Sequence, residues 1–327
     1  MNCIICNNHA DFKGSHIVTA SLIAYCVGKR NYEESYNLDT KTIDNDVFFG
    51  ASNLKNESTE IKTHPHTKDH ILCKECEKRL GELEGKFSTE FLRKYKEDRY
   101  SANFKNYVHN GIEIVEPKRL SNIQIHAYFY SIILRICKEK QIDNEEEEIN
   151  EKPYVSESEL DKIRKFLYGF LYENNSQDYV NEVADFRLAI TFDKNSEVGT
   201  CVGIFPNMFN RPRTFFLCQV YVSFFAEQSQ ENELLNFDGY VNDINSDYAK
   251  IRISPDSFDK ANELIITRFV RLQNRSYLND LCKINGKSYH ENLIELIRLS
   301  KHYQENGIDV FYTKAQTDLM DKYEKQV

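Results

Sequence analysis

The chain has 327 residues, of which 41% are hydrophobic and 28% are charged, and this composition excludes a wholly disordered protein. Its 42 Lys and Arg residues against 51 Asp and Glu residues give a net charge of -9, which excludes a protein that coats nucleic acid through bulk positive charge. No stretch reaches the roughly 18 to 20 apolar residues of a membrane span, and the start lacks a secretory-signal pattern, so we expect no membrane association and a cytoplasmic location.

The first 120 residues are predicted to contain a cysteine-bearing turn, a helix, a long insertion and a second helix. The first helix is expected over residues 19–26. Residues 31–70 are polar and have little periodicity, which predicts an irregular insertion. Apolar residues at helical spacing predict a helix from Cys73 to about Tyr100: Leu80, Leu83, Phe87, Phe91 and Leu92.

Beyond residue 120 the pattern predicts buried helices and an antiparallel sheet. A strongly apolar helix is expected over 121–140, and the acidic run at 144–148 is interpreted as a solvated linker. Ser156 and Glu159 have the spacing of a capping box, which predicts a helix whose core face carries Ile163, Phe166, Leu167 and Phe170. Alternating and β-branched segments predict strands, and helical spacing returns after them: strands within 186–192, 198–205, 214–226 and 249–254, helices within 256–305.

The sequence therefore predicts an α+β protein with two domains. Residues 1–120 contain 18 basic and 18 acidic residues, so residues 121–327 carry the whole net charge of -9. This contrast places the expected boundary near residue 115, giving an N-terminal domain at 1–115 and a mixed helical and antiparallel-sheet domain at 116–327. The acidic second domain is expected to sense a signal, bind a protein partner or form a homo-oligomer.

Four of the nine cysteines form two Cys-x-x-Cys pairs, Cys3 with Cys6 and Cys73 with Cys76. The two intervening residues allow both sulfurs of a pair to turn toward one ion about 2.3 Å away. Four thiolates are the ligand set of a closed tetrahedral zinc site, which would tie the long insertion to the start of the chain. The alternative is two coincidental pairs of reduced thiols; a redox pair is disfavoured because no βαβ pattern surrounds either.

The order of the motifs resembles one family of nucleases. Cys3-x-x-Cys6, then Ser15-His16-Ile17, then Cys73-x-x-Cys76-Glu77 is similar to the zinc-braced form of HNH, or ββα-metal, endonucleases. The resemblance covers about residues 1–100. It implies a ββα-metal fold for the N-terminal domain, binding of nucleic acid, hydrolysis of phosphodiester bonds in DNA or RNA, and, as in some such proteins, a role in bacterial anti-phage defence.

The resemblance also implies roles for single residues. His16 matches the general base that activates water, and Glu77 falls at a metal-ligand position. Ser15 stands where the family has Asp or His, so a nuclease and a degenerate module that only binds protein or nucleic acid both stay open. Glu84 follows Glu77 by two helical turns with Gly81 between them, and carboxylates suit a catalytic Mg²⁺ or Mn²⁺. For both glutamates, ordinary exposed helix residues are the alternative.

Some neighbouring polar residues have weaker patterns. Asp69, with His64 and His66, precedes the second cysteine pair and could complete a site, although an exposed loop is the favoured interpretation for the histidines. The basic stretch 93–96 with Arg99 fits phosphate contacts, and it fits equally the general preference for Lys and Arg near a helix C-terminus.

Overall fold

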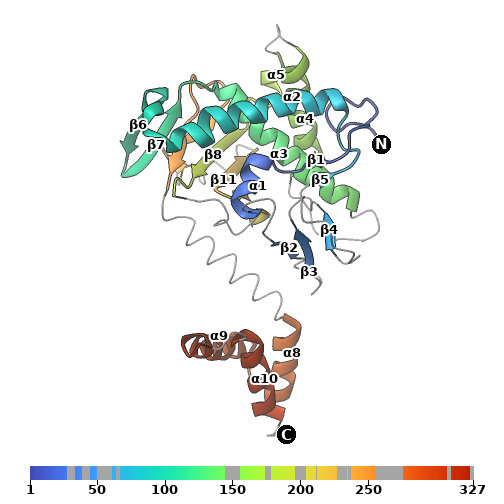
Figure 1. Cartoon of the computed structure of the whole chain (residues 1–327), viewed down its shortest axis with the longest axis vertical. Coiled ribbons are helices and arrows are strands. Elements are labelled where there is room, and N and C mark those ends of the chain that lie inside the picture. The colour runs from blue at the N-terminus through green and yellow to red at the C-terminus, as the bar shows by residue number, and fades with distance from the viewer. Residues whose placement is uncertain are drawn as a thin grey trace. The chain divides into compact units, whose positions relative to one another are not determined.

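The computed structural model forms two compact units (Figure 1). The first unit contains Met1–Asn37 and Asp46–Lys260, and the second contains Leu38–Asn45 and Ala261–Val327. The expected boundary between residues 115 and 116 falls inside β7 (Ile112–Pro117), so the contacts divide the chain elsewhere. The structure describes residues 1–27, 34–38, 45–49, 61–63, 67–143, 155–173, 178–195, 204–210, 212–226, 234, 237–254, 275–307 and 311–324.

The N-terminal part of the first unit contains a short strand pair followed by a long helix. Strand β1 (Ser15–His16) pairs antiparallel with β5 (Thr67–Lys68), and α2 (Lys74–Phe87) begins shortly after β5. Between the paired strands the structure describes α1 and a small three-stranded sheet: α1 (Ala20–Val27), β2 (Glu34–Leu38), β3 (Asn45–Phe49) and β4 (Ile61–Thr63). The insertion expected to be irregular therefore contains short strands.

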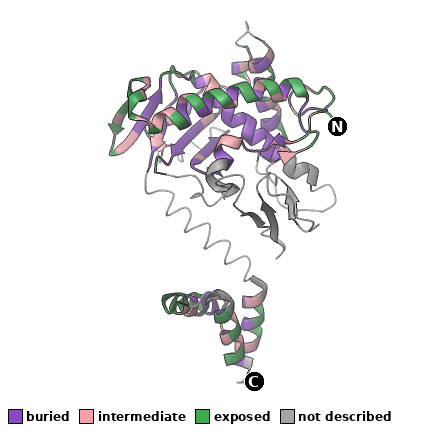
Figure 2. Ribbon diagram, in the orientation of Figure 1, coloured by how far each residue is buried: buried purple, intermediate pink, exposed green. Residues whose placement is uncertain are grey.

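The helix predicted to run to about Tyr100 is confirmed, but only its first part is regular. After α2 the chain continues as a π-helical segment (Ser88–Arg93) and two 3-10 segments (Lys94–Lys96 and Asp98–Asn103). The predicted apolar face of Leu80, Leu83, Phe87, Phe91 and Leu92 is buried throughout. The outer side of α2 is exposed, whereas the elements beneath it are buried (Figure 2).

A mixed sheet forms the centre of this unit. Its strand order is β6-β7-β13-β8-β11-β10-β9, with β12 paired to β8. All described pairings in it are antiparallel except β13 with β8, which is parallel. The strands are β6 (Phe104–His109), β7, β8 (Arg187–Phe192), β9 (Ile204–Asn210), β10 (Arg213–Leu217), β11 (Val220–Phe225), β12 (Val241–Asp243) and β13 (Ile251–Ile253).

The strand predictions hold where the structure describes the chain. The segments 186–192 and 249–254 contain β8 and β13, and the segment 214–226 covers β11 and all but the first residue of β10. Of the segment 198–205, residues 198–203 lie outside the described residues, and β9 begins at Ile204. The hairpin β6–β7 was not predicted. Its turn is the two-residue loop Asn110-Gly111, with φ of 49° and 79°. Positive φ at both residues gives a turn whose twist matches that of the flanking strands.

Helices α3 (Asn122–Asp143) and α4 (Glu157–Tyr172) pack into one core with α2 and the sheet. Tyr128 of α3 stacks on Phe87 of α2 with ring centroids 4.0 Å apart, and Tyr130 meets Phe166 of α4 edge-on at 5.5 Å. The capping box at Ser156 and Glu159 is confirmed. The short helix α5 (Asp178–Asn181) follows, and the acidic run 144–148 lies outside the described residues. This shared core explains why α3 belongs with the N-terminal segment.

The described helices of the second unit are α8 (Arg275–Asn285), α9 (Tyr289–Glu305) and α10 (Phe311–Glu324). Their apolar faces meet in a separate core of Leu278, Leu281, Leu293, Leu296, Ala315 and Leu319. The helical residues predicted within 256–274 lie outside the described residues. Among the helices that the structure describes, none is long and apolar enough to cross a bilayer.

Candidate metal centre

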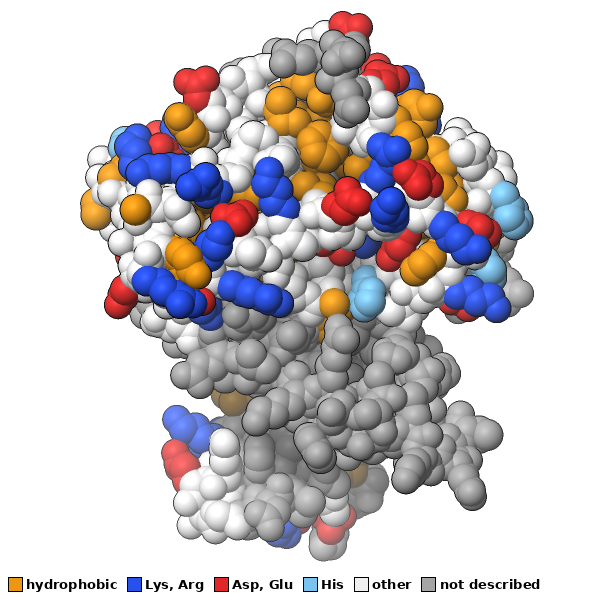
Figure 3. Space-filling model, turned by 45° about the horizontal axis from the view of Figure 1, so that its top comes forward, with side chains coloured by type: hydrophobic (Ala, Val, Ile, Leu, Met, Phe, Trp, Pro, Cys, Tyr) orange, Lys and Arg blue, Asp and Glu red, His pale blue; other side chains and the backbone are white. Residues whose placement is uncertain are grey.

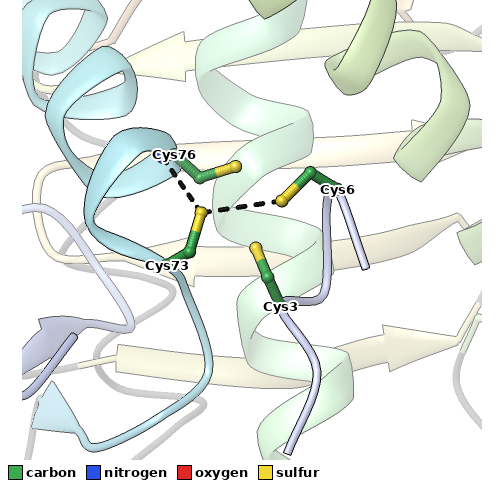
Figure 4. Close-up of side chains that lie close together, drawn as sticks. All are labelled: Cys3, Cys6, Cys73 and Cys76. Carbon is green, nitrogen blue, oxygen red and sulfur yellow. Dashed lines mark hydrogen bonds between the residues drawn. The ribbon is translucent and has the colours of Figure 1, made fainter. Parts of the chain in front are cut away.

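The four cysteines of the two Cys-x-x-Cys pairs converge on one point, as predicted (Figure 4). Their sulfur atoms all lie within 4.8 Å of one another, and the Cys6 and Cys73 sulfurs are 3.6 Å apart. Four sulfurs placed about 2.3 Å from a central ion in a tetrahedron would be separated by about 3.8 Å. This cysteine cluster (Cys3, Cys6, Cys73, Cys76) can therefore hold a metal ion and is compatible with structural zinc.

Backbone hydrogen bonds hold the two cysteine pairs together. The Ile4 amide donates to the Ile71 carbonyl at 3.0 Å, and the Phe12 amide donates to the Leu72 carbonyl at 3.2 Å. Cys73 is the N-cap of α2 and its sulfur accepts from the Cys76 amide at 3.5 Å. The start of the chain is thus bonded directly to the segment that leads into α2.

The electrostatics of the cysteine cluster favour a cation. A hydrogen bond from Cys76 lowers the pKa of Cys3 to about 4, whereas burial raises the pKa of Cys6 to about 11. The bond to Cys3 and burial both raise the pKa of Cys76 well above its usual range. One thiol therefore ionises easily and its neighbours resist a second negative charge, which a bound cation would neutralise.

A tyrosine from α4 contacts the cysteine cluster from outside. The Tyr172 hydroxyl lies 3.1 Å from the Cys76 sulfur. The Arg79 guanidinium lies over the Tyr172 ring at 4.5 Å and donates to the Leu171 carbonyl, which fixes the ring. Hydrogen bonds to metal-bound sulfur orient the ligand and tune the ion, so Tyr172 would influence the affinity of an ion held by the cysteine cluster.

Next to the cysteine cluster lies a second polar group around Glu77. Ser15 is completely buried, and its hydroxyl lies beside the Glu77 carboxyl. Burial raises the pKa of Glu77, while the charge of Arg135 and a hydrogen bond from the Ser15 hydroxyl act in the opposite direction. Buried polar atoms are normally bonded to protein, water or an ion, and this hydroxyl and carboxyl can bond to each other.

Glu84 and His16 are linked through an arginine of α3. The Arg135 Nη2 atom donates to Glu84 Oε1 at 2.6 Å, and its Nη1 atom donates to the His16 carbonyl at 2.5 Å. His16 is partly exposed in β1. There is open space beside Gly81, which lies between the two glutamates, because a Cβ there would meet no atom within 4 Å. The structure thus brings the strand bearing His16 and the helix bearing Glu77 and Glu84 to the same arginine.

The other polar residues considered from the sequence have local roles or are not described. Asp69 accepts from the Gly14 amide at 2.7 Å, and residues 64–66 lie outside the described residues. In the basic stretch, Lys94 pairs with Glu90 and Arg99 with Glu97. On the face in Figure 3, Lys and Arg side chains are interspersed with Asp and Glu, so it is not a uniformly basic surface.

Two residues near the site were not found from the sequence. Arg135 does have a signal, because it is the one Lys, Arg, Asp or Glu within the apolar run 122–137 and buried charges are rare unless paired. Tyr172 has none, since one more tyrosine at the end of an amphipathic helix looks like a packing residue. Comparison of the chain with models of known families, with curated proteins and with solved structures finds no match.

Proposed function

We propose that the N-terminal part of the chain is a zinc-braced, metal-dependent endonuclease of the HNH type that hydrolyses phosphodiester bonds in DNA, with RNA as the second substrate considered. One observation carries the proposal. The short pair β1–β5 leads into α2, both are tied to the cysteine cluster, and Arg135 bonds both the His16 carbonyl and Glu84 of α2. The resemblance to HNH endonucleases implies this arrangement, in which two strands and a helix surround a divalent ion.

The residues would divide the chemistry between them. Zinc in the cysteine cluster would fix β1 and α2 without contacting substrate. Near neutral pH, a neutral imidazole at His16 would take the proton from an attacking water molecule. Glu77 would provide an oxygen ligand for Mg²⁺ or Mn²⁺, which when bound would neutralise the scissile phosphate and the leaving oxygen. The buried Ser15 hydroxyl beside the Glu77 carboxyl would offer two oxygen atoms to such an ion.

A binding module without catalysis is the second candidate, and one contact favours it. Glu84 Oε1 is already engaged by Arg135, so this carboxylate has a structural partner that competes with a metal role. Ser15 is also a weaker ligand than the carboxylate or imidazole it replaces. In this case the cysteine cluster would still hold zinc, and the surface would bind protein or nucleic acid without cutting it.

The decisive experiment is a nicking assay with supercoiled plasmid and, separately, single-stranded RNA. The purified full chain with Mg²⁺ or Mn²⁺ is expected to cut, and His16→Ala is expected to lower the rate by about a hundredfold or more. His9→Ala, an exposed histidine of the same segment, is the matched control and should cut like the parent. If the His16 variant cuts as fast as the parent, the assignment of the general base is wrong.

The zinc assignment has its own test. Metal analysis of unchelated protein is expected to give about one zinc per chain, lost in the Cys73→Ser variant. Cys282→Ser, a cysteine outside the cluster, should retain the metal. A parent protein without zinc would overturn the proposed architecture even if some nuclease activity were found. Two further roles are predicted from the sequence alone. They are anti-phage defence, and partner binding or homo-oligomer formation through residues 116–327.

A further inference from the structure

Arg135 is the most deeply buried charged side chain near the candidate site. Its side chain is 1% exposed, although it lies in a helix whose neighbouring residues are apolar. Its guanidinium donates to four acceptors: the Ser131 carbonyl at 3.1 Å, the Ser131 hydroxyl at 3.2 Å, the His16 carbonyl at 2.5 Å and Glu84 Oε1 at 2.6 Å. These contacts join β1, α2 and α3 through one planar group.

The contacts with Ser131 fix the arginine itself. Ser131 lies one helical turn before Arg135 and is buried, and its hydroxyl also donates to the Tyr128 carbonyl at 2.8 Å. A guanidinium anchored in its own helix can present its remaining donors in a fixed fork, which a flexible ammonium cannot do. The two outward donors meet the His16 carbonyl and Glu84, both of which belong to the candidate site.

Arg135 also affects the charge of the candidate site. Glu84 is 19% exposed, Glu77 is half-buried, and Arg135 interacts electrostatically with the Glu77 carboxylate. The Arg135 guanidinium is bonded to Glu84 at 2.6 Å, so it compensates the charge of this carboxylate beside Glu77. Removal of the arginine would leave the Glu84 carboxylate uncompensated and would attract a cation more strongly.

We infer that Arg135 is a positioning residue of the proposed nuclease site, which holds the backbone of His16 in place and sets the charge that a divalent ion meets at Glu77 and Glu84. The inference rests on the proposed function. It assigns part of the site to α3, far along the chain from the two cysteine pairs, so residues 1–115 alone would lack it.

Three variants of the full chain separate the two roles. Arg135→Lys keeps the positive charge but loses the planar guanidinium with its fixed donors. Arg135→Met removes both the charge and the donors. Arg135→Met/Glu84→Gln also removes one carboxylate, so it restores the net charge of the site. Plasmid nicking is measured at saturating Mn²⁺, direct Mn²⁺ binding is measured by electron paramagnetic resonance without substrate, and thermal melting reports folding. If Arg135→Met does not fold, the lysine and double variants still test the inference.

The expected results differ between the variants. All three should lose about 10- to 100-fold in nicking rate at saturating metal, because His16 is no longer anchored. Arg135→Met alone should bind Mn²⁺ about tenfold more tightly, and the double variant should return to the parental Mn²⁺ affinity. A purely structural arginine would lower the melting temperature and the active fraction without moving Mn²⁺ affinity in this pattern.

Failure of the inference and failure of the proposed function can be told apart. A parent that cuts, together with an Arg135→Met variant that folds and cuts equally fast, overturns the inference alone. Unchanged Mn²⁺ affinity across the three variants overturns the charge role. A folded, zinc-loaded parent that cuts neither plasmid nor RNA overturns the proposed function, and the inference with it.

Discussion

Replacement of the buried His126 should change how stability depends on pH. His126 lies on α3 and is completely buried. One ring nitrogen, Nδ1, lies 3.0 Å from the Asn122 carbonyl, to which its proton is donated. Burial lowers the pKa of His126 from 6.5 to about 4, because a charged ring would be separated from water. Hydrogen bonds with the backbone of Asn122 and of Asn242 act in the opposite direction but are weaker.

The size of the effect follows from the two pKa values. As pH falls below 6.5 the unfolded chain takes up a proton at this ring, whereas the folded chain does not until about pH 4. The unfolded state therefore gains stability over this range, and the free energy of unfolding should fall by about 2 kcal/mol between pH 7 and pH 5 from this residue alone. The contribution is fully present above pH 6.5 and is lost progressively below it.

Urea unfolding followed by circular dichroism at several pH values between 5 and 7, with zinc added throughout, measures this slope. His126→Gln has no titrating ring, so its stability at pH 7 is lower but its decline toward pH 5 should be shallower by about 2 kcal/mol. The exposed His290→Gln is the control and should keep the parental slope. Parallel profiles for the parent and His126→Gln would show that the ring is not held neutral in the folded protein.

Three further predictions concern other parts of the chain. Tyr172→Phe removes the hydroxyl 3.1 Å from the cysteine cluster and should release zinc to a chelator about tenfold faster, while the exposed Tyr168→Phe should not. Gly169→Ala places a Cβ 2.3 Å from a side-chain atom of a tyrosine in α5 and should cost about 1 to 3 kcal/mol in thermal melts, whereas Gly81→Ala, with open space, should be neutral or stabilising. Although burial raises the pKa of Glu295, hydrogen bonds from two lysines and a tyrosine bring it to about 2. Glu295→Gln should therefore increase hydrogen exchange in α9 and α10 at neutral pH, and its difference from the parent should disappear as pH falls from 4.5 toward 2.

The cysteine cluster and much of the secondary structure could be predicted because their signals are local. A Cys-x-x-Cys pair already presents two sulfurs to one point, so only the meeting of the two pairs had to be inferred. The capping box at Ser156 and the apolar face of α4 likewise depend on residues three or four positions apart. The turn of the hairpin β6–β7, Asn110-Gly111, is a local signal of the same kind.

The remaining features depend on contacts between distant segments. Arg135 lies 119 positions from His16 and 51 from Glu84, and no spacing rule relates a residue of one helix to a strand so far away. The expected boundary at residue 115 relied on a change in net charge, which says nothing about how α3 packs. Stacking of Phe87 on Tyr128 continues the core across that position.

The pairing of Ser15 with Lys68 and His16 with Thr67 places the two ends of the intervening segment opposite each other. The first part of this segment belongs to the unit, because Leu22 and Ile23 of α1 lie in its core. Residues added between α1 and β5 would carry little entropic cost, since the closure entropy of a loop grows only slowly with its length. Homologous chains could therefore differ in length between α1 and β5 while β1 and β5 keep their register, and a tag or reporter domain could be inserted there.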